Sequence, residues 1–302
     1  MDVSAVRRKW YMDVNAWREG YDMHKEGQAF NLTKKSMFSV AVYCILSSRQ
    51  DYTNHIFYYK QLKKRGLLDA EAVLDAGKDK LEEILSAVVY PHEKVQYIID
   101  AAEMWSDSSF DLPARIIEDV NNGNGKQFEH RDEIAKTIPG IGKKNASFMQ
   151  NKCGAEKVPV IDTNMLSFLA DMGVISSKKE YTDSVRGISD KQYGECEMLF
   201  PKAIEVYKSL FEVEANLPDF ILSEDLTIAL WQAALWCKVS IGYNRPVKRA
   251  DSRILEYTFL IDSDEIEPAM TPHERKARKT RKIKEVPVEI DGQQETLLGC
   301  FC

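Results

Sequence analysis

The sequence predicts an all-α fold that ends in a polar C-terminal tail, and three observations support this prediction. Apolar residues recur at helical spacing along most of the chain, whereas the strict alternation of half-buried strands is rare. Beyond about residue 262 the apolar residues thin out and charged residues dominate. The length of 302 residues suits one large domain or two ordinary ones.

The helices are expected where apolar residues are periodic and turn residues separate one run from the next. The segment 35–47 is apolar nearly all round, which is typical of a central buried helix. The expected helices cover residues 35–47, 52–65, 80–87, 93–105, 113–120, 130–137, 144–152, 163–172, 191–213 and 224–237. Residues 263–302 are expected to form a weakly ordered tail, with an extended piece at 286–290.

Composition excludes several classes of protein. With 44% hydrophobic and 29% charged residues, the chain is typical of globular proteins rather than disordered or collagenous ones. The sequence contains neither a run of roughly 18 apolar residues nor the apolar core of a secretory signal. We therefore expect no membrane span, and we expect the chain to act inside the cell, in the nucleoid or cytoplasm or in a nucleus. The scattered cysteines and histidines predict no metal site.

Charge is distributed unevenly in this chain, whose formal net charge is −6. An acidic chain argues, by itself, against a nucleic-acid partner. Residues 125–152 nevertheless carry six cations against three acids, and residues 273–285 carry seven cations against two. The second run has three interpretations, which are nonspecific phosphate contacts, a nuclear address or simple solubility.

The most informative segment is Ile138-Pro139-Gly140-Ile141-Gly142-Lys143-Lys144, which lies between two expected helices. The proline ends the first helix, and the two glycines permit a tight reversal. The amides of the turn and of the next helix's first residues then point outward and form a small anion site. A phosphate fits such a site, although a helix-connecting turn without a ligand is the alternative.

This segment resembles the hairpin of the helix-hairpin-helix DNA glycosylases, the endonuclease III and 8-oxoguanine glycosylase superfamily. In that family a catalytic lysine follows the hairpin, and here it falls on Lys144. Residues 158–164 resemble the family's hydrophobic-Asp-Thr segment, which puts the catalytic aspartate on Asp162. The resemblance also implies that four hairpin residues contact the DNA backbone, namely Gly140, Ile141, Gly142 and Lys143.

Two upstream segments extend the resemblance over residues 35–172. Residues 44–50 are similar to the helix end that carries the residue wedged into the DNA stack, and residues 88–94 are similar to the loop before the next helix of the barrel. The wedge candidates are Arg49 and Gln50, of which Arg49 fits the family spacing better. Exposed polar residues after a helix are the alternative interpretation.

One departure concerns the cofactor. The endonuclease III branch carries four clustered cysteines that bind an iron–sulfur cluster, and no such spacing follows Asp162. No iron–sulfur cluster and no other cofactor are therefore expected. Among the cluster-free branches, residues 145–151 are similar to the short prokaryotic-type 8-oxoguanine glycosylases.

The chemistry explains why these residue types are needed. A lysine is a nucleophile only as the free amine, and with an ordinary pKa near 10.4 about one lysine in 2,500 is neutral at pH 7. The positive end of the helix and the neighbouring Lys143 both disfavour the ammonium form of Lys144. An ionised Asp162 would stabilise positive charge on the sugar, and its position before Thr163 also suits a helix N-cap.

The resemblance implies a two-lobed helical architecture. A barrel of residues 35–152 ends in the hairpin, and residues 1–34 and 153–262 form a second lobe, followed by the basic tail 263–302. DNA is expected to lie across a cleft in which Lys144 and Asp162 face each other.

The expected function is base-excision repair by a monomeric DNA glycosylase with abasic-site lyase activity. The expected partner is double-stranded DNA containing a damaged or modified base, with 8-oxoguanine favoured. The alternatives are a non-catalytic DNA-binding protein that kept the hairpin, and an enzyme that alters a base without excising it.

Overall fold

The computed structural model describes residues 3–12, 16–18, 20–21, 24, 32–50, 52–123, 125–181, 188–211 and 226–240. These residues form helices and turns, and they contain no strand, which confirms the all-α prediction. The expected tail at 263–302, including its extended piece and both C-terminal cysteines, lies outside the described residues. No described helix combines the length and the apolar character that crossing a membrane requires.

The helices follow the expected order with a few differences at their ends. They are α1 (Val3–Trp10), α3 (Lys34–Ser47), α4 (Tyr52–Lys64), α5 (Ala70–Leu85), α6 (Pro91–Ser106), α7 (Leu112–Asn121), α8 (Gln127–Thr137), α9 (Lys143–Lys152), α10 (Thr163–Asp171), a short 3-10 turn η1 (Lys178–Glu180), α11 (Asp190–Phe211) and α12 (Ile228–Ser240). The prediction for residues 80–87 was wrong in extent. Helix α5 begins at Ala70, because the Asp69 side chain accepts a hydrogen bond from the Ala72 amide, and it breaks at Gly77 (φ 72°) before continuing.

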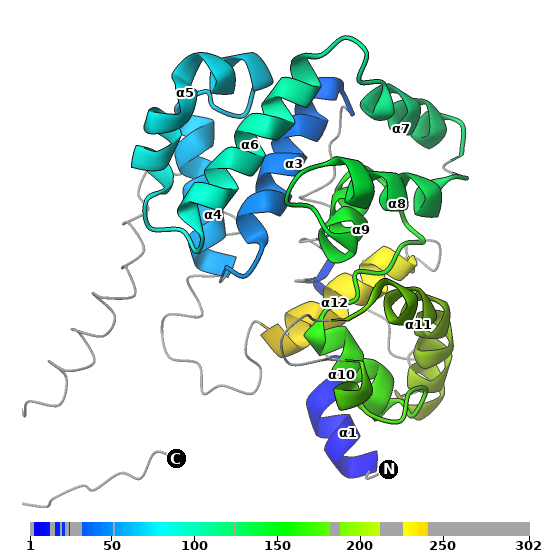
Figure 1. Cartoon of the computed structure of the whole chain (residues 1–302). Coiled ribbons are helices and arrows are strands. Elements are labelled where there is room, and N and C mark those ends of the chain that lie inside the picture. Colours follow the sequence, from blue (N-terminus) through cyan, green and yellow to red (C-terminus); the bar gives the residue numbers. More distant parts are fainter. Residues whose placement is uncertain are drawn as a thin grey trace, which may run out of the picture. The chain divides into compact units, whose positions relative to one another are not determined.

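Helix α3 is central to the first of two hydrophobic clusters. The Thr33 hydroxyl accepts a hydrogen bond from the Ser36 amide, and the Ser36 hydroxyl accepts one from the Thr33 amide, so the helix starts in a capping box. It then packs against α4, α6, α7 and α9 (Figure 1). Its buried apolar side chains are Met37, Phe38, Ala41, Val42, Cys44, Ile45 and Leu46. The larger ones, from valine upward in size, contribute about 1.5–3 kcal/mol each. The nearly all-round apolar pattern therefore reflects burial on several sides.

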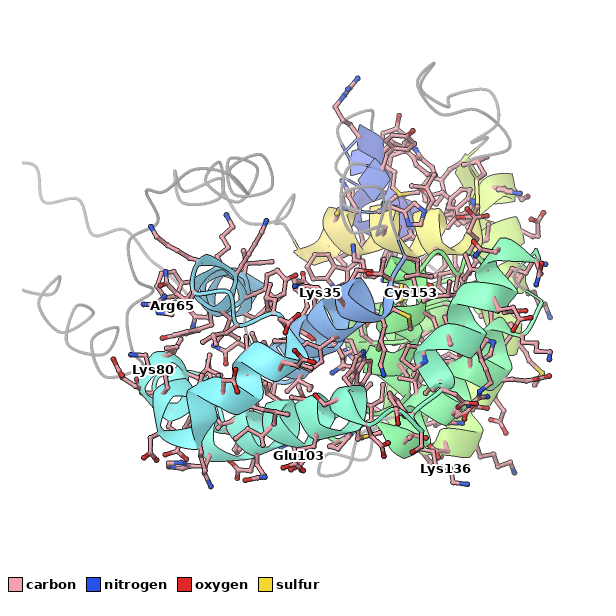
Figure 2. All side chains as sticks on the ribbon, turned by 90° about the horizontal axis from the view of Figure 1, so that it is seen from above. Lys35, Arg65, Lys80, Glu103, Lys136 and Cys153 are labelled. Carbon is pink, nitrogen blue, oxygen red and sulfur yellow. The ribbon has the colours of Figure 1, made fainter. Side chains whose placement is uncertain are left out.

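The second cluster joins α1 to α10, α11 and α12, which are far apart in the sequence. Aromatic rings dominate it, with Trp10 edge-on to Phe168 at 5.1 Å between centroids and Trp17 edge-on to Trp231 at 4.9 Å. Among the lysines, arginines, aspartates and glutamates of the described residues, four are buried, namely Lys94, Arg131, Glu197 and Lys238. In Figure 2, Lys35, Lys80 and Glu103 belong to exposed positions, whereas Cys153 is buried. The domain limits at 35–152 and 153–262 stay predictions.

Candidate active site

The hairpin between α8 and α9 is a tight turn that glycine makes possible. The Ile138 amide ends α8 by bonding to the Ile134 carbonyl at 2.9 Å, and the Ile138 carbonyl accepts the Ile141 amide at 3.2 Å. Between them Gly140 has φ +73°, the value that a type II turn needs at its third residue. A Cβ atom at Gly140 would lie 2.5 Å from Cδ2 of Tyr97. Gly140 is therefore required both by the backbone and by the ring beneath it.

The first turn of α9 is left without a cap. Gly142 is the N-cap residue, no side chain accepts a hydrogen bond from the first amides, and the first turn holds no acid. A Cβ atom at Gly142 would meet nothing within 4 Å. The start of α9 therefore has amides without a side-chain partner, and the binding of an anion there stays a prediction.

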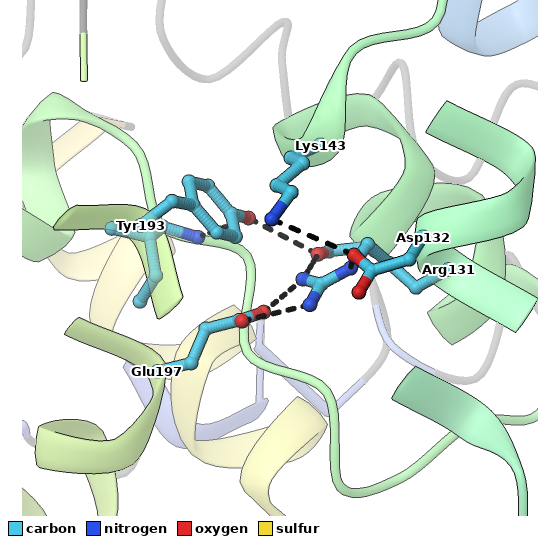
Figure 3. A network of polar contacts seen from close by, with 7 residues as sticks. Arg131, Asp132, Lys143, Tyr193 and Glu197 are labelled. Carbon is cyan, nitrogen blue, oxygen red and sulfur yellow. Dashed lines mark hydrogen bonds and ion pairs between the residues drawn. The ribbon is translucent and has the colours of Figure 1, made fainter. Parts of the chain in front are cut away.

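The two lysines that open α9 have different surroundings. Lys143 Nζ lies 3.7 Å from Asp132 Oδ1, and its side chain is 22% exposed (Figure 3). Lys144 is exposed and makes no hydrogen bond or ion pair with any described residue. Burial raises the pKa of the Cys44 thiol, and the positive charge of Lys144 partly opposes that rise. The Lys144 amine is therefore close enough to Cys44 of α3 for their charges to interact. Of the pair, only Lys144 presents an amine without a partner in the described structure.

Asp162 caps the helix that follows it. Its Oδ1 accepts hydrogen bonds from the amides of Asn164 at 2.8 Å and Met165 at 2.9 Å, which confirms the N-cap interpretation. Its Oδ2 has no hydrogen-bond partner among the described residues. No hydrogen bond or ion pair joins Lys144 to Asp162 in this part of the chain, so the predicted catalytic pairing stays a prediction.

A buried polar network lies behind the hairpin (Figure 3). Arg131 of α8 binds the Glu197 carboxylate of α11 through both terminal nitrogens, with Nη2 2.9 Å from Oε2. Arg131 is 3% exposed and Glu197 is 7% exposed. Arg131 also donates from Nε to Asp132 at 2.7 Å, and Asp132 in turn pairs with Lys143. Sequence reasoning missed this network, because its partners are separated by up to 66 positions.

The two wedge candidates differ in what their side chains do. Arg49 has φ +52° and Tyr90 has φ +57°, a conformation that other described non-glycine residues do not adopt. Arg49 Nη1 donates to the Tyr90 hydroxyl at 3.3 Å, and its guanidinium lies 5.7 Å from the ring centroid. Gln50 uses its side-chain oxygen to accept the Val89 amide at 2.8 Å. The segments 44–50 and 88–94, singled out separately in the sequence, thus lie side by side.

A buried lysine, Lys94, connects the segment 88–94 to the end of α3. Lys94 is 3% exposed, and its Nζ donates to the Leu46 carbonyl at 2.8 Å, near the end of α3. A cation at a helix C-terminus is favourable for the helix dipole, but burial lowers the pKa of Lys94 to about 8. Sequence reasoning missed both Lys94 and Tyr90. A lysine inside an apolar helical face was the available signal.

The cysteines and acidic side chains of the described residues do not gather into a metal-binding group. These residues contain no group of three or more His, Cys, Asp or Glu side chains that could hold a metal ion. Cys44, Cys153, Cys196 and Cys237 are buried.

Comparisons with known proteins agree with the resemblance. The family model described as 8-oxoguanine DNA glycosylase matches residues 22–208. A search of curated proteins finds no match. Among solved structures, the Methanocaldococcus jannaschii 8-oxoguanine glycosylase/lyase in complex with a 15-mer DNA containing 8-oxoguanine is 18% identical. Its TM-score is 0.51, and the match covers 74% of this chain and 88% of that chain, which shows the shared helical fold.

Two further structures are similar. The Methanocaldococcus jannaschii 8-oxoguanine DNA glycosylase is 17% identical, with a TM-score of 0.49 over 78% of this chain and 86% of that one. The Thermotoga maritima 8-oxoguanine DNA glycosylase is 18% identical, with a TM-score of 0.46 over 74% and 87%. The matched family is one of the cluster-free branches, in agreement with the expectation that no iron–sulfur cluster is bound. The chain belongs to the 8-oxoguanine DNA glycosylase family, which makes it a DNA glycosylase of base-excision repair.

Proposed function

We propose that this chain excises 8-oxoguanine from double-stranded DNA, with Lys144 as the nucleophile and Asp162 as the supporting carboxylate. The observation that carries the assignment is the difference between the two lysines of α9. Lys143 is paired with Asp132, whereas Lys144 is exposed without a described partner at an uncapped helix start. An unpaired amine at the positive end of a helix is costly for stability and useful for nucleophilic attack.

The proposed reaction begins when an extruded nucleotide presents its C1′ atom to Lys144 Nζ. The N–C1′ bond forms as the glycosidic bond breaks, and the base leaves with the bonding electron pair and takes up a proton. The nitrogen then gives up one proton, the C1′–O4′ bond breaks as O4′ takes up a proton, and the nitrogen keeps its last proton as a protonated Schiff base. Loss of a C2′ proton to a base forms an enamine, whose electron pair expels the 3′ phosphate. The Asp162 carboxylate would stabilise the cationic sugar and accept a lysine proton, using the Oδ2 atom that the cap leaves unused.

DNA would be held by the hairpin and by the loop after α3. The turn formed by Gly140, Ile141, Gly142 and Lys143, with the uncapped first amides of α9, is proposed to bind a backbone phosphate. Arg49 is proposed as the residue that fills the gap left by the extruded base, with its guanidinium supported by Tyr90. Gln50 is the weaker candidate, because its side chain already accepts the Val89 amide.

The proposed organisation is a barrel of residues 35–152, a second lobe of residues 1–34 and 153–262, and a basic tail at 263–302. The protein would act as a monomer, with double-stranded DNA lying between the two lobes. The tail would add phosphate contacts, and the salt dependence of DNA binding with and without it would measure them.

Borohydride trapping tests the proposal directly, because it reduces a Schiff base to a stable crosslink. Wild type incubated with 8-oxoguanine duplex and borohydride should form a covalent protein–DNA adduct, and Lys144→Gln should form none. Lys143→Gln is the matched control, since it removes the neighbouring, ion-paired amine and leaves the Lys144 amine in place. It should still form the crosslink, although more slowly, because a nearby positive charge that disfavours the ammonium form of Lys144 is lost. Wild type that binds duplex without crosslinking or cleaving it would contradict the proposal and favour a non-catalytic binder. An altered base on an intact sugar, detected by mass spectrometry, would identify a base-modifying enzyme instead.

A further inference from the structure

Tyr193 of α11 joins two segments that the proposed function needs to hold in register. Its hydroxyl donates to the Ser147 hydroxyl oxygen at 3.1 Å and accepts the Ile161 amide at 3.1 Å. Ser147 lies on α9, three residues after Lys144, and Ile161 is the residue directly before Asp162. One hydroxyl group thus links the helix that carries the proposed nucleophile to the backbone that carries the proposed carboxylate.

The surroundings of Tyr193 leave it little freedom. The residue is 1% exposed, and Ser147 is fully buried. The Arg131 guanidinium lies 5.5 Å from the Tyr193 ring centroid and donates to the Ser147 hydroxyl oxygen at 3.2 Å. The bidentate contact between Arg131 and Glu197 fixes the guanidinium in turn (Figure 3). Buried hydrogen-bonded networks of this kind define a single arrangement, because any displacement leaves buried polar groups unpaired.

We infer that Tyr193 is a positioning residue for the glycosylase reaction, and that it sets the spacing between Lys144 and Asp162. This inference rests on the proposed function of these two residues. The linkage spans 46 positions between Tyr193 and Ser147 and 32 positions between Tyr193 and Ile161, so it adds a tertiary connection to the backbone segment that joins Ser147 to Ile161. A displacement of about 1 Å between reacting groups can lower a rate about a hundredfold. Tyr193 touches neither proposed reacting group and acts only through Ser147 and Ile161.

The same helix supplies a matched control. Tyr207 of α11 is also 1% exposed, and its hydroxyl also makes two buried hydrogen bonds. It accepts the Met12 amide at 3.2 Å and donates to the Trp10 carbonyl at 2.9 Å. Tyr207→Phe therefore removes the same chemical group from the same helix, in contact with the N-terminal segment rather than with α9.

The test compares Tyr193→Phe and Tyr207→Phe in the full chain under single-turnover conditions, with enzyme in excess over 8-oxoguanine duplex. Tyr193→Phe should lower the excision rate about tenfold or more, while the Kd for duplex DNA stays within about twofold. Tyr207→Phe should keep the wild-type excision rate, even if its thermal unfolding temperature falls as much as that of Tyr193→Phe. Equal rate losses in the two variants, or a Tyr193→Phe rate within about twofold of wild type, would overturn the inference.

Two further variants keep the outcome interpretable. If Tyr193→Phe does not fold, Ser147→Ala breaks the link to α9 and leaves the Ile161 hydrogen bond intact. It should lower the rate about threefold or more, and an unchanged rate would equally overturn the inference. Lys144→Gln separates the two proposals. If wild type is active, Lys144→Gln is inactive and Tyr193→Phe excises at the wild-type rate, only the positioning role of Tyr193 is contradicted. If wild type itself does not excise 8-oxoguanine, the proposed function is contradicted.

Discussion

The hairpin region has an exposed side, the front, which is the first turn of α9 with Lys144, and a buried side, the back, which is the network around Arg131 and Tyr193. The two sides differ in how their polar groups are satisfied. At the front, the first amides of α9 have no side-chain cap, Gly142 faces open space, and the Lys144 amine has no described partner. At the back, Arg131 and Tyr193 are almost completely buried, and each makes several hydrogen bonds. The cost of an unpaired polar group is small in water and large in the interior. The first amides of α9 and the Lys144 amine are therefore unpaired where a ligand from solvent can pair with them, whereas Arg131 and Tyr193 obtain their partners from the chain itself.

The largest effect on the free energy of unfolding is expected from breaking the buried ion pair between Arg131 and Glu197. Arg131→Ala should lower the free energy of unfolding by about 3–5 kcal/mol, because it leaves the Glu197 carboxylate buried without its partner. The double variant Arg131→Met with Glu197→Leu should lie within about 1 kcal/mol of wild type, since both charges are removed together. Urea denaturation measures both. A single variant as stable as wild type would show that the pair is not held as described.

Lys94 is an intermediate case, since it is buried but bonded to a carbonyl instead of an acid. Burial lowers the pKa of Lys94 to about 8, from an ordinary value of 10.5 that applies to the unfolded chain. Below pH 8 both states are protonated. Between about pH 8 and 10.5 the folded state has released the proton while the unfolded state retains it, so this residue's contribution to stability rises with pH.

Relative to Lys94→Met, the free energy of unfolding of wild type should therefore increase by up to about 3 kcal/mol across this pH range. The comparison with the variant removes the contributions of buried tyrosines and cysteines, which act in the opposite direction at high pH. Urea denaturation at pH 7, 9 and 10 would measure the difference. A constant difference between the two proteins at all three values would contradict a lowered pKa at Lys94.

The capping role of Asp162, which is observed, can be separated from its proposed catalytic role. Asparagine caps a helix about as well as aspartate, so Asp162→Asn should change the free energy of unfolding by less than about 0.5 kcal/mol. The same variant lacks the carboxylate charge and should excise 8-oxoguanine about a hundredfold more slowly. Asp162→Ala loses the cap as well and should cost about 1 kcal/mol of stability. Full activity in Asp162→Asn would restrict this residue to the capping role observed here.

The smallest effects are expected from the two hairpin glycines, and they should differ in kind. Gly140→Ala should cost about 1–2 kcal/mol, because φ is positive and a Cβ atom would collide with the Tyr97 ring. Gly142 has φ −83° and open space, so Gly142→Ala should change stability by less than about 0.5 kcal/mol. It should weaken binding to duplex DNA, since the methyl group lies where a phosphate would approach. Fluorescence anisotropy and urea denaturation would distinguish the two, and equal stability losses would refute this assignment.

Much of the fold was predictable from the sequence because helices are local. Periodicity located the central helix α3, and Pro139 with Gly140 located the hairpin within about a residue of its observed place. The start of α5 was not predicted from the apolar spacing. Gly77 has a positive φ inside this helix, so the apolar residues before and after it do not follow one continuous helical period. Helix α1 was missed because its buried face is completed by α12, which lies more than 200 residues away.

The candidate site also has some features that follow from the local sequence and others that depend on tertiary contacts. The sequence by itself determined the glycine turn, the lysine pair and the aspartate cap, since each depends on the backbone preferences of neighbouring residues. Only the tertiary structure decided that Lys143 is paired and Lys144 is not, that Arg49 rests on Tyr90, and that Tyr193 joins α9 to the segment before Asp162. These contacts link residues far apart along the chain, and a hydrogen bond depends on positions in space to within a few tenths of an ångström, which sequence spacing does not specify.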